Sequence, residues 1–123
     1  MADSELTGKI IGAAIEVHRI LGPGLLESAY ELALVKELRI RGIKVERQVV
    51  LPIEYKGEII DPGYRMDLLV DDAVIVELKA VEEINKLHIA QTLTYMKLSK
   101  KPLGLLINFK VTKLTKGIKR LKL

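Results

Sequence analysis

The chain has 123 residues, 49% hydrophobic and 29% charged, with a formal net charge of +4, four Tyr, one Phe, no Trp and no Cys. This length and apolar content predict one domain over residues 1–123 whose core needs no disulfides, while the composition excludes thiolate metal sites and disfavours base-stacking single-strand binders. No long uncharged apolar segment or basic leader is visible, so we expect neither membrane insertion nor export, and a cytoplasmic protein.

Two helices are predicted at the N-terminal end, separated by Gly22-Pro23-Gly24. In the first, His18 lies on the apolar stripe, which favours a satisfied core histidine over a ligand. In the second, which ends before Gly42, Glu27 occupies the first turn, where the helix dipole favours an acid whether or not it binds anything. Tyr30 is expected to pack. The expected buried residues are Leu6, Ile10, Ala14, Val17 and Leu21 in the first helix and Leu26, Ala29, Ala33 and Val35 in the second.

An antiparallel group of strands is predicted next, and its last two members should form a hairpin around Asp71-Asp72. Alternation in the second of these strands places Glu77 and Lys79 on one face and its Val and Leu residues on the other. A two-residue loop would put Asp67 on the wrong face for Glu77, so we predict the three-residue loop 71–73, which brings the two acids opposite each other. The predicted strands are 44–55, 58–61, 64–70 and 74–80.

Two carboxylates that approach closely repel each other, and a hard divalent ion bound through oxygen ligands relieves that repulsion. Mg²⁺ fits best, with Mn²⁺ as the alternative. Such an ion lowers the pKa of bound water and polarises a phosphoryl oxygen, while Lys79 would orient the attacking water or neutralise charge on the phosphate. Asp67, Glu77 and Lys79 therefore predict metal-assisted phosphodiester cleavage, although a surface hairpin with a Glu-Lys pair would explain the same residues.

A third helix is predicted over residues 84–99, followed by a strand at 103–109. His88, Gln91 and Tyr95 share one helix face, a grouping that an exposed polar face would also explain. The strand is continuously apolar, as expected of one covered on both faces, and its position after a helix predicts a parallel crossover. A short basic tail or helix should close the chain. The expected buried face of the helix consists of Leu87, Ala90, Leu93 or Thr94, and Leu98.

Charge is unevenly distributed along the chain. All 16 acids lie at or before Glu83, together with 10 basic residues, whereas the last 40 residues hold 10 Lys or Arg and no acid. We predict a phosphate-contacting surface there, with salt-dependent binding, although contact with the acidic part of the chain or a role in solubility would explain the same pattern. The surface would comprise Lys110, Lys113, Lys116, Lys119, Arg120 and Lys122.

The segment Gly24-Leu25-Leu26-Glu27-Ser28-Ala29-Tyr30 resembles the signature of the small prokaryotic GxxExxY proteins, which belong to the PD-(D/E)xK nuclease superfamily. The similarity runs through the hairpin to Gln91-Thr92-Leu93-Thr94-Tyr95, which resembles the Gln-x-x-x-Tyr helix motif of RecB-like members. One departure is Met66, which stands where the superfamily name has proline. Its loss weakens the resemblance more than the chemistry.

The resemblance implies a role for each matched residue. Lys79 would be the catalytic lysine, acting with Asp67 and Glu77. The implied metal ligands are Glu27, Asp67, Glu77, the backbone carbonyl of Leu78 and, by analogy with some RecB-like relatives, His18. The residues implied to support the site or contact nucleic acid are Gln91, Tyr95 and Tyr30.

Together these features predict a restriction-endonuclease-like α/β fold, a three-layer sandwich with a mixed sheet flanked by helices. The expected function is divalent-metal-dependent hydrolysis of nucleic acid, with DNA as the first candidate substrate. The alternative is a non-catalytic nucleic-acid-binding or assembly subunit that keeps the nuclease-like fold. Because no separate DNA-reading segment is visible, a homodimer or a partner protein is expected.

Overall fold

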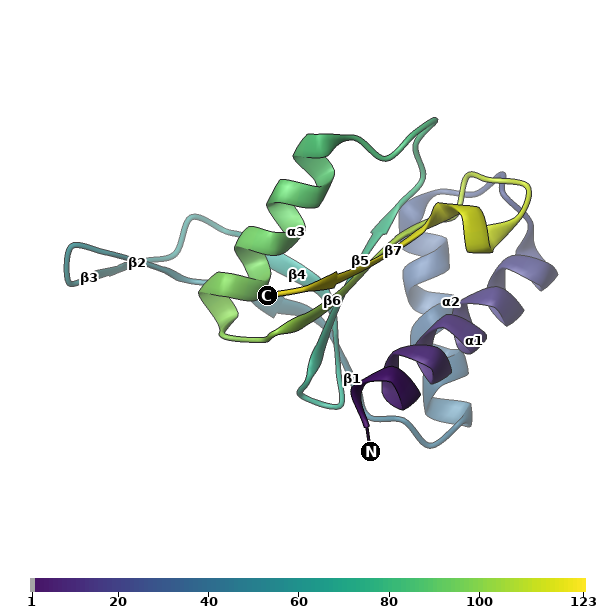
Figure 1. Ribbon diagram of the computed structural model, residues 1–123, viewed down its shortest axis with the longest axis horizontal. Coiled ribbons are helices and arrows are strands. Elements are labelled where there is room, and N and C mark those ends of the chain that lie inside the picture. The colour runs from purple at the N-terminus through teal and green to yellow at the C-terminus, as the bar shows by residue number, and fades with distance from the viewer. Residues whose placement is uncertain (1) are drawn as a thin grey trace.

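The computed structural model describes residues 2–123 and arranges them in three layers, with α1 and α2 on one face of a central sheet and α3 on the other (Figure 1). This is the predicted α/β architecture of the restriction-endonuclease-like fold. The elements are α1 (Asp3–Leu21), α2 (Glu27–Ile40), β1 (Val45–Val50), β2 (Ile53–Tyr55), β3 (Glu58–Ile60), β4 (Arg65–Val70), β5 (Val74–Lys79), α3 (Lys86–Ser99), β6 (Leu103–Asn108), the 3₁₀ turn η1 (Leu114–Gly117) and β7 (Ile118–Lys122).

The central sheet has five strands in the order β1-β4-β5-β6-β7. All neighbours are antiparallel except β5 and β6, which are parallel and joined by α3, so the predicted crossover is confirmed. Every residue of β6 is buried, as expected for a strand covered on both faces. At Gly104 the helix comes so close that an added Cβ would lie 2.5 Å from Met96 Sδ, which explains the absence of a side chain there.

The predicted tail or closing helix is wrong, because residues 118–122 form the edge strand β7. Pairing with β6 satisfies the backbone of this segment, and strand alternation sends Ile118 to the α1 side and Leu121 to the α3 side. The two apolar residues of this basic segment, Ile118 and Leu121, thus contribute one side chain to the core on each side of the sheet.

Two hydrophobic clusters fill the spaces on either side of the sheet. The predicted faces of α2 and α3 are partly wrong, since Leu26 and Leu87 are 78% and 76% exposed. Leu26 lies just outside α2, and α3 contacts the sheet through a narrow line of side chains. The buried residues are Tyr30, Glu31, Leu34, Val35 and Leu38 in α2 and Thr92, Tyr95 and Met96 in α3.

The register of the β4–β5 hairpin is the predicted one. Val70 pairs with Val74 and Leu68 with Val76, which leaves a three-residue loop at 71–73 and brings Asp67 opposite Glu77. Asp71 and Asp72 both adopt φ of 53°, a left-handed conformation that aspartate tolerates better than most residues. None of the helices in residues 2–123 combines the length and apolarity needed to cross a bilayer.

Candidate active site

The centre of the candidate site is the point where β4 and β5 stop pairing through their backbones. The backbone N–H of Asp67 donates to Glu77 Oε2 at 2.7 Å, and the N–H of Leu78 donates to Asp67 Oδ2 at 2.8 Å. Each carboxylate thus replaces a carbonyl as hydrogen-bond acceptor for the opposite strand. The two acids are held side by side where the hairpin opens.

Burial controls the electrostatics of this pair. Desolvation raises the pKa of Glu77 to about 8, and repulsion from Asp67 adds to the effect. Burial also raises the pKa of Asp67, although the hydrogen bond from Leu78 opposes it. Lys79 follows Glu77 on the same strand face, and its positive charge favours the ionised form of both acids. The positive charge of Lys79 therefore does not fully offset the burial and mutual repulsion of the two acids.

The edge strand β1 changes direction beside Asp67. Its pairs with β4 include Arg47 with Leu68 and Val49 with Met66, so Gln48 lies opposite Asp67 but takes no part in the pairing. Gln48 has φ of 52°, which is uncommon outside glycine. The backbone of β1 is therefore irregular next to the acids, although its register with β4 is the same before and after Gln48.

Glu31 anchors this irregular segment from α2, and the sequence reasoning missed it. Its side chain is buried and accepts from Arg47 Nη2 at 2.8 Å and from Gln48 Nε2 at 2.6 Å. The sequence does contain one indication of this role, because Glu31 lies one helical turn after Glu27 and so shares its face of α2. A second missed residue is Asn108, whose amide bonds both backbone groups of Val81 and so fixes the chain just after β5.

Replacing Glu31 with glutamine is expected to lower the free energy of unfolding by about 1–3 kcal/mol, because Arg47 loses an ionic partner and two amide groups then face each other. Urea denaturation would measure the loss. Glu46→Gln is the matched control, since Glu46 is an exposed acid on the neighbouring strand. Equal stabilities for the two variants would contradict the role assigned to Glu31.

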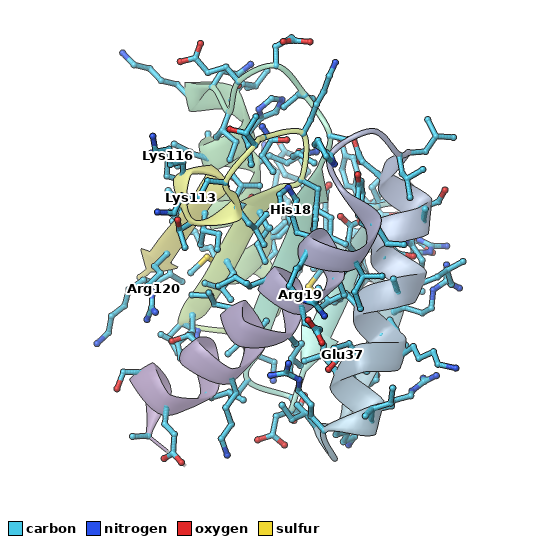
Figure 2. The ribbon with its side chains drawn as sticks, turned by 90° about the vertical axis from the view of Figure 1, so that its right-hand side faces the viewer. His18, Arg19, Glu37, Lys113, Lys116 and Arg120 are labelled. Atoms are coloured by element: carbon cyan, nitrogen blue, oxygen red, sulfur yellow. The ribbon has the colours of Figure 1, made fainter. Side chains whose placement is uncertain are left out.

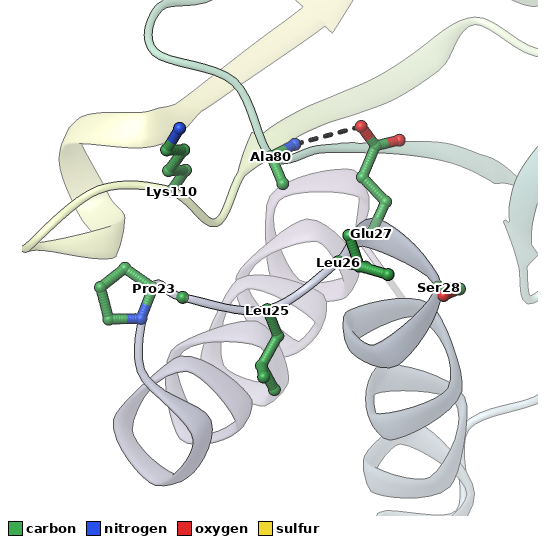
Figure 3. Close-up of a pocket in the computed structure, with 8 residues that line it drawn as sticks. Pro23, Leu25, Leu26, Glu27, Ser28, Ala80 and Lys110 are labelled. Atoms are coloured by element: carbon green, nitrogen blue, oxygen red, sulfur yellow. Dashed lines mark hydrogen bonds between the residues drawn. The ribbon is translucent and has the colours of Figure 1, made fainter.

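Glu27 lies at the end of β5, in the first turn of α2. Its Oε2 accepts from the N–H of Ala80 at 3.3 Å (Figure 3). Its negative charge contributes to the raised pKa of Asp67, so the two carboxylates interact electrostatically. An open hollow of about 560 Å³ adjoins Glu27 and is bordered by residues 23–28, Ala80 and Lys110. Glu27 thus stands between the acid pair and an accessible surface.

A family model described as the PD-(D/E)XK nuclease superfamily matches residues 4–121, nearly the whole chain. The chain belongs to the PD-(D/E)XK nuclease superfamily. No curated protein and no solved structure gives a significant match.

The oxygen donors at Asp67 and Glu77 suit a hard divalent cation. Hydrogen bonds use one oxygen of each acid, leaving Asp67 Oδ1 and Glu77 Oε1 outside the bonds formed within residues 2–123. No buried side-chain oxygen in that part of the chain lacks a partner, so these two oxygens reach solvent. Within the same residues, however, no three Asp, Glu or His side chains converge closely enough to hold an ion alone. A bound cation would therefore complete its shell with water, backbone or substrate oxygens.

Tyr95 of α3 faces the site from the other layer. Burial raises the pKa of its hydroxyl, and the charge of Glu77 adds to the increase. Gln91 Nε2 donates to the Tyr95 hydroxyl at 3.1 Å, so the two residues of the Gln-x-x-x-Tyr motif act on each other. His88 is used differently: its N–H and ring form a capping box with Asn85 at the start of α3.

His18 and Tyr30 are built into the core beside the site. A ring nitrogen of His18 lies 2.7 Å from the carbonyl oxygen of Val111. Tyr30 is fully buried and stacks on Phe109 with ring centroids 4.4 Å apart. Its hydroxyl donates to the Gly22 carbonyl and accepts from the Leu25 N–H, which fixes the turn that precedes Glu27. Tyr30 thus positions the loop rather than meeting a ligand at the surface.

The basic C-terminal residues are divided among different parts of the molecule. Figure 2 shows Lys113, Lys116 and Arg120 along one flank of α1, where Arg120 Nη1 donates to Thr7 Oγ1 at 3.1 Å. Lys119 points to the opposite face of β7, beside Glu82 and Glu83. Lys110 borders the hollow at Glu27 and pairs with the exposed Glu82. The six residues do not form one patch.

Proposed function

We propose that the chain hydrolyses nucleic-acid phosphodiester bonds with the help of a divalent cation. The observation that carries the proposal is the buried, mutually repelling pair Asp67 and Glu77, which is held at an open end of the hairpin with Lys79 on the same face. Two hard oxygen donors with too little positive charge around them fit Mg²⁺ or Mn²⁺. Membership of a nuclease superfamily agrees with this chemistry.

Each side chain then has a distinct task. Asp67 and Glu77 would hold the cation, with the Leu78 carbonyl as a further oxygen donor and Glu27 acting through a bound water. When bound, the cation supplies Lewis acidity at the phosphodiester. Lys79 would hold the attacking water and neutralise charge that develops on the phosphate oxygens during in-line displacement. The Tyr95 hydroxyl, which Gln91 fixes, would orient the substrate from the α3 layer.

The path of the nucleic acid follows from the basic groups nearest the acids. Lys79 and Lys110 lie where the parallel strands β5 and β6 end, and the η1 turn carries Lys113 and Lys116 beyond them. A phosphate backbone that crosses this end of the sheet would meet these lysines beside Asp67 and Glu77. Backbone recognition of this kind is independent of sequence and weakens with salt. We favour DNA as the substrate, with RNA as the alternative.

Cleavage of labelled single- and double-stranded DNA and RNA tests the proposal. We expect cutting with Mg²⁺ or Mn²⁺ and none with EDTA. Lys79→Ala should slow cutting by at least about 10²-fold, because it removes charge stabilisation in the transition state, and Glu77→Ala should abolish metal-dependent cutting. Glu83→Ala, an exposed acid on the loop after β5, is the matched control. Cutting that survives both site substitutions would refute the assignment.

A second candidate function is a nucleic-acid-binding or assembly subunit without catalysis. The observation that favours it is that the carboxylates of Glu77 and Asp67 accept hydrogen bonds from the backbone N–H groups of Asp67 and Leu78, which gives both acids a structural task. In such a subunit Lys79→Ala would leave oligonucleotide affinity nearly unchanged, whereas Lys113→Ala with Lys116→Ala would lower it and reduce its salt dependence. Native protein that binds but never cuts would select this function.

We also infer that the chain belongs with the GxxExxY proteins inside the superfamily. The three residues that define the name each have a use here. Gly24 lies in the turn before α2, Glu27 bonds the end of β5, and Tyr30 fixes that turn from the core. The signature residues therefore shape the turn that places the Glu27 carboxylate of α2 near the acid pair.

A further inference from the structure

We propose that a second copy of this chain binds at the β2–β3 ribbon and the groove beside it, which makes the protein a two-fold symmetric dimer. The ribbon projects from the sheet beyond β1 and β4, away from α1 and α2 (Figure 1). Its two strands pair only with each other, and β3 is exposed throughout. A lone two-stranded ribbon is marginally stable in water. Packing of its apolar residues against another surface would therefore stabilise it.

Three of the four apolar side chains of the ribbon lie on one face, those of Ile53, Tyr55 and Ile60. Ile53 pairs with Ile60 and Tyr55 with Glu58, so these four residues point the same way, whereas Glu54 and Ile59 point to the opposite face. Tyr55 is 60% exposed. Ile53, at the root of the ribbon, forms one wall of a groove of about 500 Å³. The same ribbon face therefore carries exposed apolar residues at its tip and an apolar groove at its root.

The other wall of the groove is the outer face of α3. The main apolar side chains that line it are Leu87, Ala90 and Leu98, with Tyr64 and Tyr95 between the ribbon and the helix. Leu87 is 76% exposed, which is high for a leucine in a helix. The groove is also lined by His88, Gln91 and Thr94, but apolar and aromatic side chains form most of its surface. A groove of this kind fits protein side chains better than the polar edges of nucleotides.

The tip of the ribbon and the groove at its root lie on the same face, and this arrangement allows two copies of the chain to bind each other. When two such ribbons cross antiparallel about a two-fold axis, the tip of each meets the root groove of the other. Charge favours the same contact. Residues 53–61 hold three acids and one lysine, a net charge of −2, whereas residues 86–100 hold three lysines and no acid. Lys86 and Lys97 share the helix line of Ala90 and Thr94, beside the groove.

Sedimentation equilibrium of the full chain tests the proposal. We expect a dimer with a dissociation constant on the order of micromolar. Tyr55→Glu at the tip and Leu87→Glu in the groove should each raise that constant at least about tenfold. Ile59→Glu is the matched control, because Ile59 lies on the same ribbon but on its other face and should leave the dimer intact.

Charge reversal distinguishes a second copy from any other dimer. Glu58→Lys and Lys97→Glu should each weaken the homodimer, because the ribbon and the groove then carry the same sign. Mixed together, the two variants should form a heterodimer, since both of its contacts regain opposite charges. The readout is mass and is independent of cleavage, so it stands whether or not the chain is a nuclease.

Three results would overturn the proposed dimer. The first is native protein that stays monomeric at concentrations well above about 100 μM. The second is a dimer that Tyr55→Glu and Leu87→Glu do not affect. The third is a monomer whose oligonucleotide affinity falls in those same variants, which would assign the groove to nucleotide bases instead.

Discussion

Replacing Glu77 with glutamine is expected to make the metal-free protein more stable at pH 8 while abolishing metal-dependent cleavage. The carboxylate is buried beside Asp67, so ionising it within the fold is unfavourable. Glutamine keeps an oxygen that can accept the hydrogen bond from the Asp67 N–H and carries no charge. Stability and activity should therefore change in opposite directions, as expected for a strained functional site.

The pH dependence of this effect has a definite sign. The pKa of Glu77 is raised from 4.5 to about 8 in the folded protein, so the fold binds this proton more tightly than the unfolded chain does. The stability it contributes is complete below about pH 4.5 and is lost as the pH rises to about 8. At about 1.4 kcal/mol per pH unit the upper limit is near 5 kcal/mol, and relaxation around the site should reduce it to about 2 kcal/mol.

Thermal unfolding at pH 5 and pH 8 would measure the effect. Glu77→Gln should raise the Tm at pH 8 by about 5–15 °C relative to the native protein and have little effect at pH 5. Glu82→Gln is the control, because Lys110 lowers the pKa of that exposed acid and no such gain is expected. Mg²⁺ at about 100 times its dissociation constant should stabilise the native protein at pH 8 by about 2.7 kcal/mol and leave Glu77→Gln unchanged. A Glu77→Gln protein that is less stable at both pH values would contradict the argument.

The acid pair was predictable because its geometry is local. Alternation along Val74–Lys79 determines which side chains share a face, and the length of one loop decides whether Asp67 meets Glu77. Both are properties of a segment of about 15 residues, and both are confirmed. The parallel crossover was also accessible, since a buried apolar strand that follows a helix has few other positions in a sheet.

The supporting residues were not predictable, because long-range packing defines them. Glu31 acquires its role only when β1 brings Arg47 and Gln48 to α2, and Asn108 only when β6 lies beside the end of β5. Nothing within a few residues of either one specifies these contacts. The exposure of Leu87 is a similar case, because periodicity identifies an apolar helix face but not whether that face meets the sheet or remains open.

Replacing Phe109 with alanine is expected to lower the free energy of unfolding by about 3–5 kcal/mol. The ring is fully buried, stacks on Tyr30 and lies 6.3 Å from the ring of His18. Removing it would leave a cavity between β6, α1 and α2. Urea denaturation would measure the loss, with Leu32→Ala as the control, because Leu32 is an exposed residue of α2 and should change stability by less than about 1 kcal/mol.

Changing Phe109 should also affect the candidate active site, because Phe109 contacts Lys79 and the residue that positions Glu27. Its backbone N–H donates to the carbonyl of Lys79 at 2.9 Å, and its ring supports Tyr30, which fixes the turn before Glu27. We therefore expect Phe109→Leu, which fills most of the cavity and stays folded, to weaken Mg²⁺ binding by severalfold even though no atom of Phe109 meets the ion. If Phe109→Leu loses stability but binds Mg²⁺ as the native protein does, the position of Glu27 does not depend on this stack, and the hairpin acids hold the cation without help from α2.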